Sequence, residues 1–252
     1  MTGGRRALVT GASAGLGAHL ASRLAEDGWQ VLGLGRRPTA EVSSVPGVDY
    51  VSLDLSTPDA AAAVAAHLDD VPDVVVHNAV SYPVRSGGTS GSAELEAVFR
   101  VNALLPYRLT ADLLERKPDD RFCSVVMVNS ESMFHADATS GEYGASKAAL
   151  RVLTSALAAS CRGRNASVST LLLGPLWDAK RAADIGRVAA KRGVPVADVT
   201  RLFLRRSNSD LVIDFFIDLE SCYRSLRYLV DLGRVANGTV CRLDGGSAGS
   251  LI

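Results

Sequence analysis

The stretch Thr10-Gly11-Ala12-Ser13-Ala14-Gly15-Leu16-Gly17, residues 10–17, lies between an apolar run and a helical pattern. Residues 7–10 predict a strand, and the leucine spacing in residues 16–25 predicts a helix with one apolar face. Glycines in such a turn allow a tight bend and a close approach of backbone N–H groups to a pyrophosphate, near the positive end of the helix dipole. The stretch therefore predicts a dinucleotide-binding strand-turn-helix unit at the start of the chain.

The same alternation of strands and helices continues along the chain. Strand-like runs occupy residues 30–34, 50–53, 74–76, 124–128, 167–173 and 239–243. Helical patterns occupy residues 59–68, about 93–114, about 143–159 and 214–231, and the segment 177–208 is basic and helix-friendly. Repeated alternation of this kind predicts an α/β fold in one domain, residues 1–252, with a doubly wound parallel sheet and helices on both faces.

The composition argues against several function classes. The 252 residues contain 27 Lys and Arg against 27 Asp and Glu, so the chain lacks the basic excess by which proteins bind nucleic acids or anionic membranes. A hydrophobic content of 47% is enough for a buried core. The sequence has no leader-like or membrane-spanning apolar run, its four cysteines form no Cys-x-x-Cys pair, and its four histidines are scattered. We expect a cytoplasmic protein with no membrane, nucleic-acid or metal partner.

The glycine stretch also contains a rival motif. Gly11-Ala12-Ser13-Ala14-Gly15 has the form G-x-S-x-G, which would make Ser13 the nucleophile of an α/β-hydrolase. In such a hydrolase several strands precede the serine and the histidine lies near the C-terminus, whereas here one strand precedes Ser13 and no histidine follows His135. The chain order argues against the hydrolase, and a glycine turn that binds nothing is the third alternative.

The residues after the second expected strand indicate which dinucleotide would bind. A site that prefers NAD places an acid there, about 20 residues past the glycines, against the ribose 2′-hydroxyl. This chain has Arg36 and Arg37, and guanidinium groups bind a 2′-phosphate that a carboxylate would repel. The pair predicts NADP(H) as the cofactor, and the alternative is two solvated arginines on a loop.

Tyr143 and Lys147 lie four residues apart, on one face of an expected helix. A phenol has an ordinary pKa near 10, and a cation at about 4–6 Å lowers that pKa toward the range in which the group can transfer protons. The pair therefore predicts an acid–base site that protonates a carbonyl oxygen. An exposed helical pair without function is the alternative.

From Thr10 to Gly246 the chain resembles the short-chain dehydrogenase/reductase family, whose fold is of the Rossmann type. The glycine stretch matches the family's cofactor loop, and Tyr143-Gly144-Ala145-Ser146-Lys147 matches its Tyr-x-x-x-Lys motif. Asn102 and Ser130 occupy the positions of its proton-relay asparagine and its catalytic serine, with Ser132 as an alternative to Ser130. The resemblance implies a catalytic set of Ser130, Tyr143, Lys147 and Asn102.

The resemblance also implies a cofactor site. Asp54-Leu55 matches the family's adenine-binding position, and Asn78-Ala79 matches part of its Asn-Asn-Ala-Gly turn. The residues expected to bind NADP(H) are Gly11, Ser13, Ala14, Gly15, Leu16, Gly17, Arg36, Arg37, Asp54, Leu55, Asn78, Ala79, Tyr143, Lys147, Pro175 and Trp177. The implied reaction is the NADPH-dependent reduction of a ketone or aldehyde to an alcohol, on a small-molecule carbonyl substrate such as a polyketide- or acyl-type compound. A dinucleotide-binding sensor or scaffold without catalysis is the alternative.

Several positions depart from the family pattern. His77 and Val80 stand where the family has Asn and Gly, so we expect a larger side chain to crowd the turn beside the cofactor. Gly174-Pro175 reverses the family's Pro-Gly, which alters the expected backbone contact with the nicotinamide carboxamide. Ala14 stands where NADP-using members often have a basic residue, which leaves the 2′-phosphate to the two arginines.

The segment at about 177–212 corresponds to the family's substrate lid and is basic. An anionic substrate is one explanation for its cations, and a solvated helical lid is the other. Phe134, His135 and Trp177 are candidates for the wall of the substrate pocket. The resemblance further implies a homodimer or homotetramer, formed through the helix that contains Asn102 and the helix that begins at Tyr143.

Overall fold

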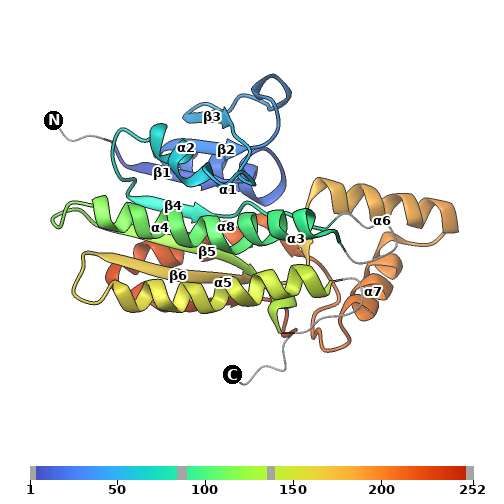
Figure 1. Ribbon diagram of the computed structural model, residues 1–252. Helices are drawn as coiled ribbons and strands as arrows, with labels where there is room; N and C mark the ends of the chain where they lie inside the picture. The colour runs from blue at the N-terminus through green and yellow to red at the C-terminus, as the bar shows by residue number, and fades with distance from the viewer. Residues whose placement is uncertain (1–3, 84–89, 135–139, 248–252) are drawn as a thin grey trace.

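The expected strands form one parallel sheet of seven strands in the order β3-β2-β1-β4-β5-β6-β9, in a computed structural model that describes residues 4–83, 90–134 and 140–247. The strands are β1 (Arg6–Thr10), β2 (Gln30–Gly35), β3 (Val48–Ser52), β4 (Val74–His77), β5 (Cys123–Ser130), β6 (Ala166–Leu173) and β9 (Val240–Leu243). β4 and β6 are buried at every position, as parallel strands covered on both faces must be. The α/β fold class is confirmed, and the architecture is a single Rossmann-like domain (Figure 1).

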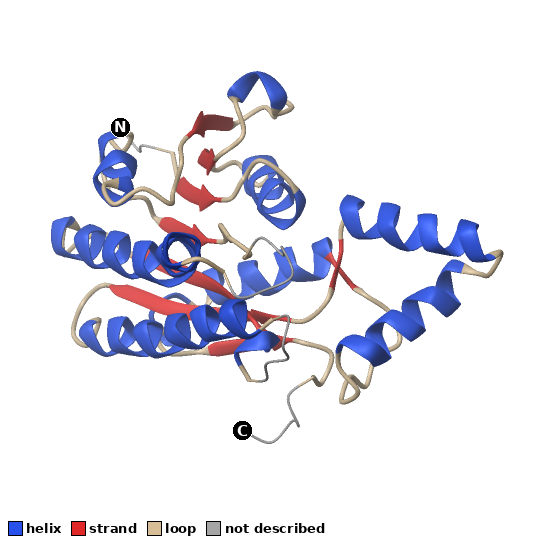
Figure 2. Ribbon diagram, turned by 45° about the vertical axis from the view of Figure 1, so that its right-hand side comes forward, coloured by secondary structure: helices blue, strands red, loops and turns tan. Residues whose placement is uncertain are grey.

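Helices cover both faces of the sheet (Figures 1 and 2). α1 (Gly15–Glu26) and α8 (Leu219–Asp231) pack on one face and form one apolar core with the strands. α2 (Ala60–Ala66), α4 (Leu105–Arg116) and α5 (Gly141–Ser160) pack on the other face and form a second core. The shorter 3-10 turns are Thr39–Glu41, Glu131–Met133 and Gly233–Ala236.

The sheet reverses its strand order between β1 and β4. β1 pairs with β2 on one side and with β4 on the other, and both pairings are parallel. Ligands of open α/β sheets bind outside the carboxyl ends of the strands at such a reversal. The glycine turn follows β1, Asn78 follows β4 and Ser130 ends β5, so the fold gathers these expected site residues at the carboxyl edge of the sheet.

The helix expected at about 93–114 is interrupted. It consists of α3 (Ser92–Phe99), a π-helical turn (Arg100–Leu104) and α4. Pro106 is the physical reason, because it has no N–H to donate to the carbonyl of Asn102 four residues earlier. The turn carries Asn102 into the interior, where the residue is 1% exposed.

The helix expected at 214–231 begins later, at Leu219. Asp218 caps it by accepting a hydrogen bond from the N–H of Ser221 at 2.7 Å. Just before this cap, β8 (Ile217–Asp218) pairs with β7 (Leu176–Trp177) in a second, two-stranded sheet. The expectation of a helix from residue 214 is therefore wrong, because the chain is held in an extended form up to the cap.

The basic segment after β7 forms a helical arm, α6 (Ala179–Arg192) and α7 (Val196–Ser207), which projects from the rest of the molecule (Figure 2). The arm has an apolar cluster that is separate from the two cores on the sheet. The buried members of this cluster are Ile185, Ala189, Val199, Leu204 and Phe216. The expected lid segment is thus a pair of helices with a small core.

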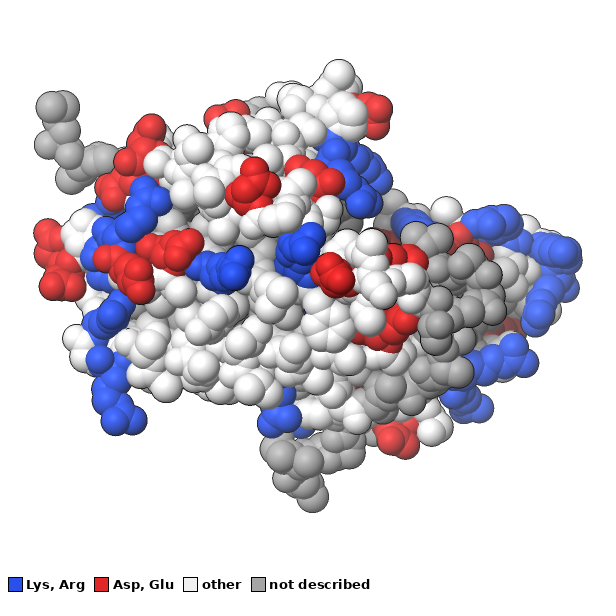
Figure 3. Space-filling view, in the orientation of Figure 1, with Lys and Arg blue, Asp and Glu red and all other residues white. Residues whose placement is uncertain are grey.

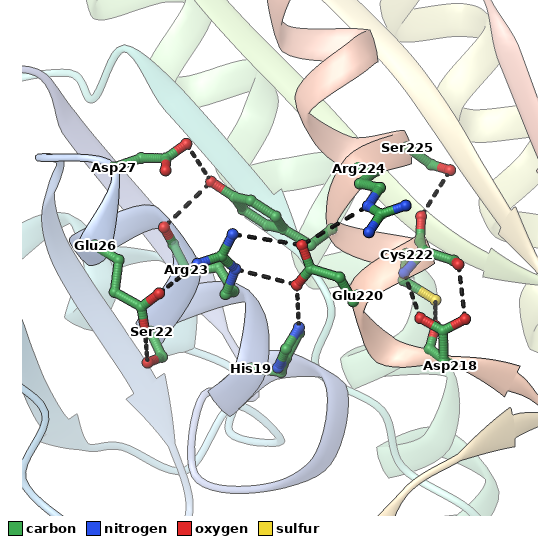
Figure 4. A network of polar contacts seen from close by, with 12 residues as sticks. His19, Ser22, Arg23, Glu26, Asp27, Asp218, Glu220, Cys222, Arg224 and Ser225 are labelled. Atoms are coloured by element: carbon green, nitrogen blue, oxygen red, sulfur yellow. Dashed lines mark hydrogen bonds and ion pairs between the residues drawn. The ribbon is translucent and has the colours of Figure 1, made fainter.

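A network of polar side chains joins α1 to α8 (Figure 4). Glu220 accepts a hydrogen bond from the Nε of Arg23 at 3.1 Å and lies 3.2 Å from the Nε2 of His19. One turn further along α8, the hydroxyl of Tyr223 donates to Asp27 at 2.6 Å. The network therefore fastens the last long helix to the helix that carries the glycine turn.

The surface carries charges of both signs, and basic side chains gather over the helical arm in Figure 3. All four cysteines are free. In the described ranges, no helix is long and apolar enough to cross a membrane. Within the same ranges, no group of three His, Cys, Asp or Glu side chains is placed to hold a metal ion.

Candidate active site

The turn after β1 has a shape that requires glycine at two positions. Gly11 has a φ of 72°, and a Cβ built on it would lie 2.8 Å from the Cα of Ala79. A Cβ on Gly17 would lie 2.1 Å from the carbonyl oxygen of Gly11. Both distances are far below van der Waals contact, so a side chain at either position would displace the turn.

The N-terminus of α1 is open to a ligand. Its N-cap residue, Ala14, is extended and provides no side-chain hydrogen bond to the first turn of the helix. A Cβ on Gly15 would have one neighbouring atom within 4 Å, the Oδ2 of Asp178 at 3.5 Å. Backbone N–H groups without a side-chain cap, together with the helix dipole, favour an anion at this end. The turn therefore fits the pyrophosphate of a dinucleotide.

Thr10 joins β1 to β4 beside this turn. Its Oγ1 accepts hydrogen bonds from the N–H groups of Asn78 and Ala79, both at 3.0 Å. The Nδ2 of Asn78 donates in turn to the carbonyl of Thr10 at 3.0 Å. Asn78 and Ala79 thus lie against the glycine turn. Thr10 is not among the residues expected to bind the cofactor. Its position as the last residue of β1, directly before the glycine turn, is the feature of the sequence that could have indicated its role.

The expectation that His77 crowds the cofactor turn is wrong. His77 is buried, and its Nε2 lies 2.9 Å from the Oγ1 of Thr110 on α4. Burial lowers the pKa of His77 to about 3, so the imidazole is neutral at physiological pH. The side chain points toward α4 because alternate residues of a strand face opposite sides of the sheet. Val80, the other departure, is 43% exposed.

The two arginines after β2 are exposed at the outer end of the carboxyl edge. The carboxylate of Asp54 accepts hydrogen bonds from the N–H and hydroxyl of Ser56, at 2.9 and 2.8 Å. The hydrogen bond from the Ser56 N–H is the main reason that the pKa of Asp54 lies below its ordinary value, and the positive charge of Arg36 adds to it. Arg36 and Asp54 therefore lie near each other. Arg37 accepts a hydrogen bond at its carbonyl from the hydroxyl of Tyr50 at 2.9 Å.

Two of the expected cofactor residues have buried apolar side chains, and a third, Ser13, is half-buried. Leu16 and Leu55 are buried in the two cores, so only their backbone atoms can contact a cofactor. Ser13 lies against the end of β2, where a Cβ on Gly35 would be 3.2 Å from its hydroxyl oxygen. Within the described part of the chain, no histidine hydrogen-bonds to Ser13, so the structure provides no base for the hydrolase alternative.

α5 brings Tyr143 and Lys147 to β5. The Nζ of Lys147 donates to the carbonyl of Val128 at 3.0 Å and lies 6.0 Å from the centroid of the Tyr143 ring. Lys147 is 4% exposed, and burial lowers the pKa of its ammonium to about 8. The pair therefore lies together on one helix face, and the pKa of the ammonium is close to neutral pH.

The pKa of Tyr143 shifts in the direction opposite to the expected one. Burial raises this pKa well above its ordinary value, and a hydrogen bond with Ser130 opposes the shift only in part. The Lys147 ammonium does not offset the burial, because it lies 6.0 Å from the ring and donates to a backbone carbonyl. The ring of Tyr82 lies 4.7 Å from that of Tyr143, centroid to centroid. No role for Tyr82 is predicted from the sequence. The only feature that could have indicated one is its position in the loop after β4.

Ser130 and Ser132 lie side by side at the end of β5. The hydroxyl of Ser130 donates to the Oγ of Ser132 at 3.2 Å and accepts from the N–H of Ser132, also at 3.2 Å. Ser130 is also close enough to the Tyr143 phenol to lower its pKa. This contact favours Ser130 over Ser132 as the hydroxyl next to the phenol.

The side chain of Asn102 is fully engaged by protein groups. Its Nδ2 donates to the carbonyl of Ser81 at 2.8 Å and to the hydroxyl of Ser146 at 2.9 Å, while its Oδ1 accepts from the N–H of Ser81 at 2.8 Å. Ser146 directly precedes Lys147 on α5. Asn102 thus ties the loop after β4 to the helix that carries the tyrosine and the lysine.

The residues after β6 lead from the sheet to the helical arm. The carbonyl of Pro175 accepts a hydrogen bond from the N–H of Ile217 at 2.9 Å, and the ring of Trp177 lies 5.3 Å from that of Phe216. Asp178 caps α6 by accepting from the N–H of Arg181 at 2.7 Å. Because the other carboxylate oxygen of Asp178 faces the glycine turn, the start of the arm reaches the expected cofactor site.

The aromatic residues expected to line the substrate pocket belong to different parts of the molecule. Phe134 lies below the guanidinium groups of Arg151 and Arg242, whose Cζ atoms are 5.7 and 5.9 Å from its ring centroid. Trp177 belongs to the base of the arm, through its contact with Phe216. His135 lies outside the described residues.

The chain matches the model of the short chain dehydrogenase family over residues 5–183. It is 30% identical over 242 residues to L-xylo-3-hexulose reductase of Hypocrea jecorina, and the alignment covers 83% of this chain and 78% of the relative. The fold resembles that of L-sorbose reductase from Gluconobacter frateurii, solved with NADPH and L-sorbose, with a TM-score of 0.80, 18% identity and 98% of each chain covered. It also resembles 4-hydroxyisoleucine dehydrogenase, solved with NADH, with a TM-score of 0.81, 20% identity, and 98% of this chain and 100% of that chain covered. On this match and this geometry, the chain belongs to the short-chain dehydrogenase family and is an oxidoreductase with a site for a nicotinamide dinucleotide.

Proposed function

We propose that the protein reduces a ketone or an aldehyde to an alcohol, with NADPH as the hydride donor. The observation that carries the proposal is the position of Tyr143 beside the buried Lys147, with Ser130 close by at the end of β5, at the carboxyl edge where the glycine turn also lies. A protein that only binds a dinucleotide has no need of a phenol, a hydroxyl and a cation in this arrangement. We propose a small carbonyl compound as the substrate, of polyketide or acyl type.

The proposed roles follow from the protonation of the side chains. A bound nicotinamide supplies a hydride for the carbonyl carbon. Tyr143 keeps its proton at neutral pH, since burial raises further a pKa that is ordinarily near 10, and it donates that proton to the carbonyl oxygen. Ser130 hydrogen-bonds the same oxygen and stabilises the negative charge that develops on it. Lys147 binds the ribose hydroxyls and keeps a positive charge beside the phenol.

Reprotonation of Tyr143 needs a path for protons from solvent. The side-chain amide of Asn102 makes three hydrogen bonds with Ser81 and Ser146. We therefore assign Asn102 a positioning role through its side chain, and we assign the ordering of water to its backbone carbonyl in the π-helical turn. The reason for this division of roles is Pro106. A proline has no backbone N–H, so the carbonyl of Asn102 lacks its usual helical donor and can accept a hydrogen bond from water instead.

NADP(H) is the form of the cofactor that the charges favour. Arg36 and Arg37 are exposed where a 2′-phosphate would lie, and no acid replaces them at the end of β2. Asp54 lies close enough to Arg36 to be influenced by its charge, and its carboxylate is already bonded to Ser56. The two similar structures differ in this respect, since one was solved with NADPH and the other with NADH.

We also propose a cytoplasmic homodimer or homotetramer that associates through α4 and α5. Val152 on α5 is 70% exposed and Leu104, just before α4, is 47% exposed. A second copy would cover apolar side chains of this kind. Gel filtration with light scattering measures the oligomeric state directly, and a monomer would contradict this proposal.

A screen of ketones and aldehydes that follows the oxidation of NADPH tests the proposed reaction. Replacement of Tyr143 by Phe removes the proton donor and keeps the ring, so we expect turnover to fall by roughly 10²–10⁴-fold on any accepted carbonyl. The affinity for NADPH, measured by fluorescence titration, should change little. Undiminished turnover in Tyr143→Phe would place the proton donor elsewhere.

Titration of NADPH against NADH tests the cofactor preference. We expect clear preference for NADPH in the native protein and its loss in a variant with Arg36→Ala and Arg37→Ala. The affinity for NADH should stay close to the native value, since NADH has no 2′-phosphate for the arginines to bind. Equal affinity of the native protein for both cofactors would overturn the roles of the two arginines.

A further inference from the structure

Eight lysines and arginines lie in the helical arm, and one of them differs from the rest. Seven are exposed, which agrees with a solvated basic surface, and two of these, Arg187 and Arg201, form ion pairs with Asp184 and Asp198 on their own helices. Arg181 is half-buried instead. The seven exposed cations are Lys180, Arg187, Lys191, Arg192, Arg201, Arg205 and Arg206.

Aromatic rings hold the guanidinium of Arg181. Its Cζ lies 4.4 Å from the centroid of the Phe203 ring and 5.7 Å from that of Phe216. It makes no ion pair with any carboxylate in the parts of the chain that the structure describes. Stacking on aromatic rings fixes a guanidinium while its N–H donors stay available for a ligand.

The position of Arg181 does not stabilise its own helix. It lies in the first turn of α6, which contains no acidic residue and where the helix dipole disfavours a cation. The cap residue Asp178 accepts a hydrogen bond from the backbone N–H of Arg181 rather than from its guanidinium. A half-buried cation at this end of a helix is a local conflict of the kind that proteins tolerate at functional sites.

Neighbouring contacts connect Arg181 to the catalytic tyrosine. Tyr82 lies within electrostatic range of Arg181. The ring of Tyr82 is in turn 4.7 Å from the ring of Tyr143. Phe216, one of the two rings that hold Arg181, also contacts Trp177 at the base of the arm. Asp178, which caps the same turn of α6, also lies beside Gly15, so Arg181 belongs to the part of the arm that adjoins the glycine turn.

We propose that Arg181 binds a carboxylate of the carbonyl substrate, so that the substrate is a keto acid or an aldehyde acid whose carbonyl lies at Tyr143. This inference rests on the proposed function and adds the class of substrate to it. The planar guanidinium matches the two oxygens of a carboxylate, and because it forms no ion pair with a carboxylate of the described residues, the pairing is left to a ligand. The charge of Asp178, three residues away, favours a monoanion over the dianion of a phosphate ester.

The test compares a charged substrate with its neutral counterpart. The substrates are 4-oxopentanoate and its methyl ester, with NADPH, and the variant is Arg181→Met, which keeps an apolar stem between the rings without the charge. We expect kcat/KM for the acid to fall by about 10–100-fold, as for the loss of a charged hydrogen-bonded pair, and kcat/KM for the ester to stay within about twofold. The control variant Arg187→Met removes an exposed arm cation and should leave both substrates at the native rate.

A binding measurement makes the result independent of turnover. Calorimetric titration of pentanoate and of pentanamide into the NADPH-loaded protein should show binding of the acid alone, and Arg181→Met should abolish it. Equal losses for the acid and the ester in Arg181→Met, or equal binding of pentanoate and pentanamide, would overturn the role of Arg181. Arg181-dependent binding of pentanoate without reduction of any carbonyl compound would contradict the proposed reaction and leave the carboxylate site in place.

Discussion

Burial controls the protonation of three side chains near the carboxyl edge of the sheet. It raises the pKa of Tyr143, and it lowers the pKa of Lys147 to about 8 and of His77 to about 3. Each shift favours the neutral form, because a low-dielectric environment disfavours charge. The phenol is therefore protonated at neutral pH, the ammonium is only partly charged above pH 8, and the imidazole remains neutral.

His77 makes the stability of the fold sensitive to acid. Its pKa is about 3 in the folded chain and near 6.5 in the unfolded chain, so between these values the unfolded state binds more protons. The free energy of unfolding should therefore fall as the pH falls below 6.5, by up to about 1.4 kcal/mol per pH unit from this residue. The change His77→Gln keeps a polar partner for Thr110 and removes the titration, so its loss of stability with acid should be smaller.

Urea unfolding of the native protein and the variant at pH 7.5, 6.0 and 5.0 measures this difference. The exposed His67 offers a matched control, since His67→Gln should follow the native pH dependence. If His77→Gln loses as much stability with acid as the native protein, another group carries the pH dependence.

At the scale of elements, the start of α6 meets the glycine turn. Asp178 uses one carboxylate oxygen to cap α6, and its other oxygen would lie 3.5 Å from a Cβ on Gly15. A pyrophosphate at the turn would therefore face a like charge. The change Asp178→Asn keeps a good cap and removes that charge, so we expect NADPH and NADH to bind more tightly, by roughly 3–10-fold at low salt.

Fluorescence titration of both cofactors at two salt concentrations checks this expectation, and the gain should shrink at high salt. Asp184→Asn removes a charge further along α6 and serves as the control. Weaker binding by Asp178→Asn would mean that the carboxylate holds the cofactor rather than repels it.

The elements that the sequence predicts well are those with a strong local signal. The glycine turn, the apolar strands β4 and β6 and the Tyr143–Lys147 spacing all depend on residues close together in the chain. The interruption at Asn102 has a local signal too, in Pro106, although the apolar pattern of the helix continues across it. The contact of Tyr82 with Tyr143 has no such signal, because tertiary packing alone brings these residues together.

The direction of the Tyr143 pKa could not be predicted for the same reason. Spacing places Lys147 near the phenol, and the tertiary structure determines how deeply both groups are buried. The side of the sheet that His77 faces also depends on the register of β4, which packing against α4 sets. A sequence pattern therefore locates the chemical groups, and burial determines their charge.

At the scale of the whole molecule, stability is divided between the sheet and the arm. Two large cores cover the faces of the sheet, whereas the helical arm depends on a small cluster around Phe216 and Leu204. Segments with few buried apolar contacts open at a lower free energy than the central strands. We therefore expect the backbone amides of α6 and α7 to exchange with solvent at least about tenfold faster than those of β6.

Hydrogen exchange followed by mass spectrometry, with and without NADPH, measures both the opening of the arm and its link to the cofactor site. Because Asp178, at the start of α6, lies beside Gly15 of the glycine turn, NADPH should slow exchange in residues 11–17 and at the start of α6. β9, at the far edge of the sheet, serves as an internal control and should change little. An arm as protected as β6 without cofactor would contradict this expectation, because it would show that the sheet and the arm open as one unit.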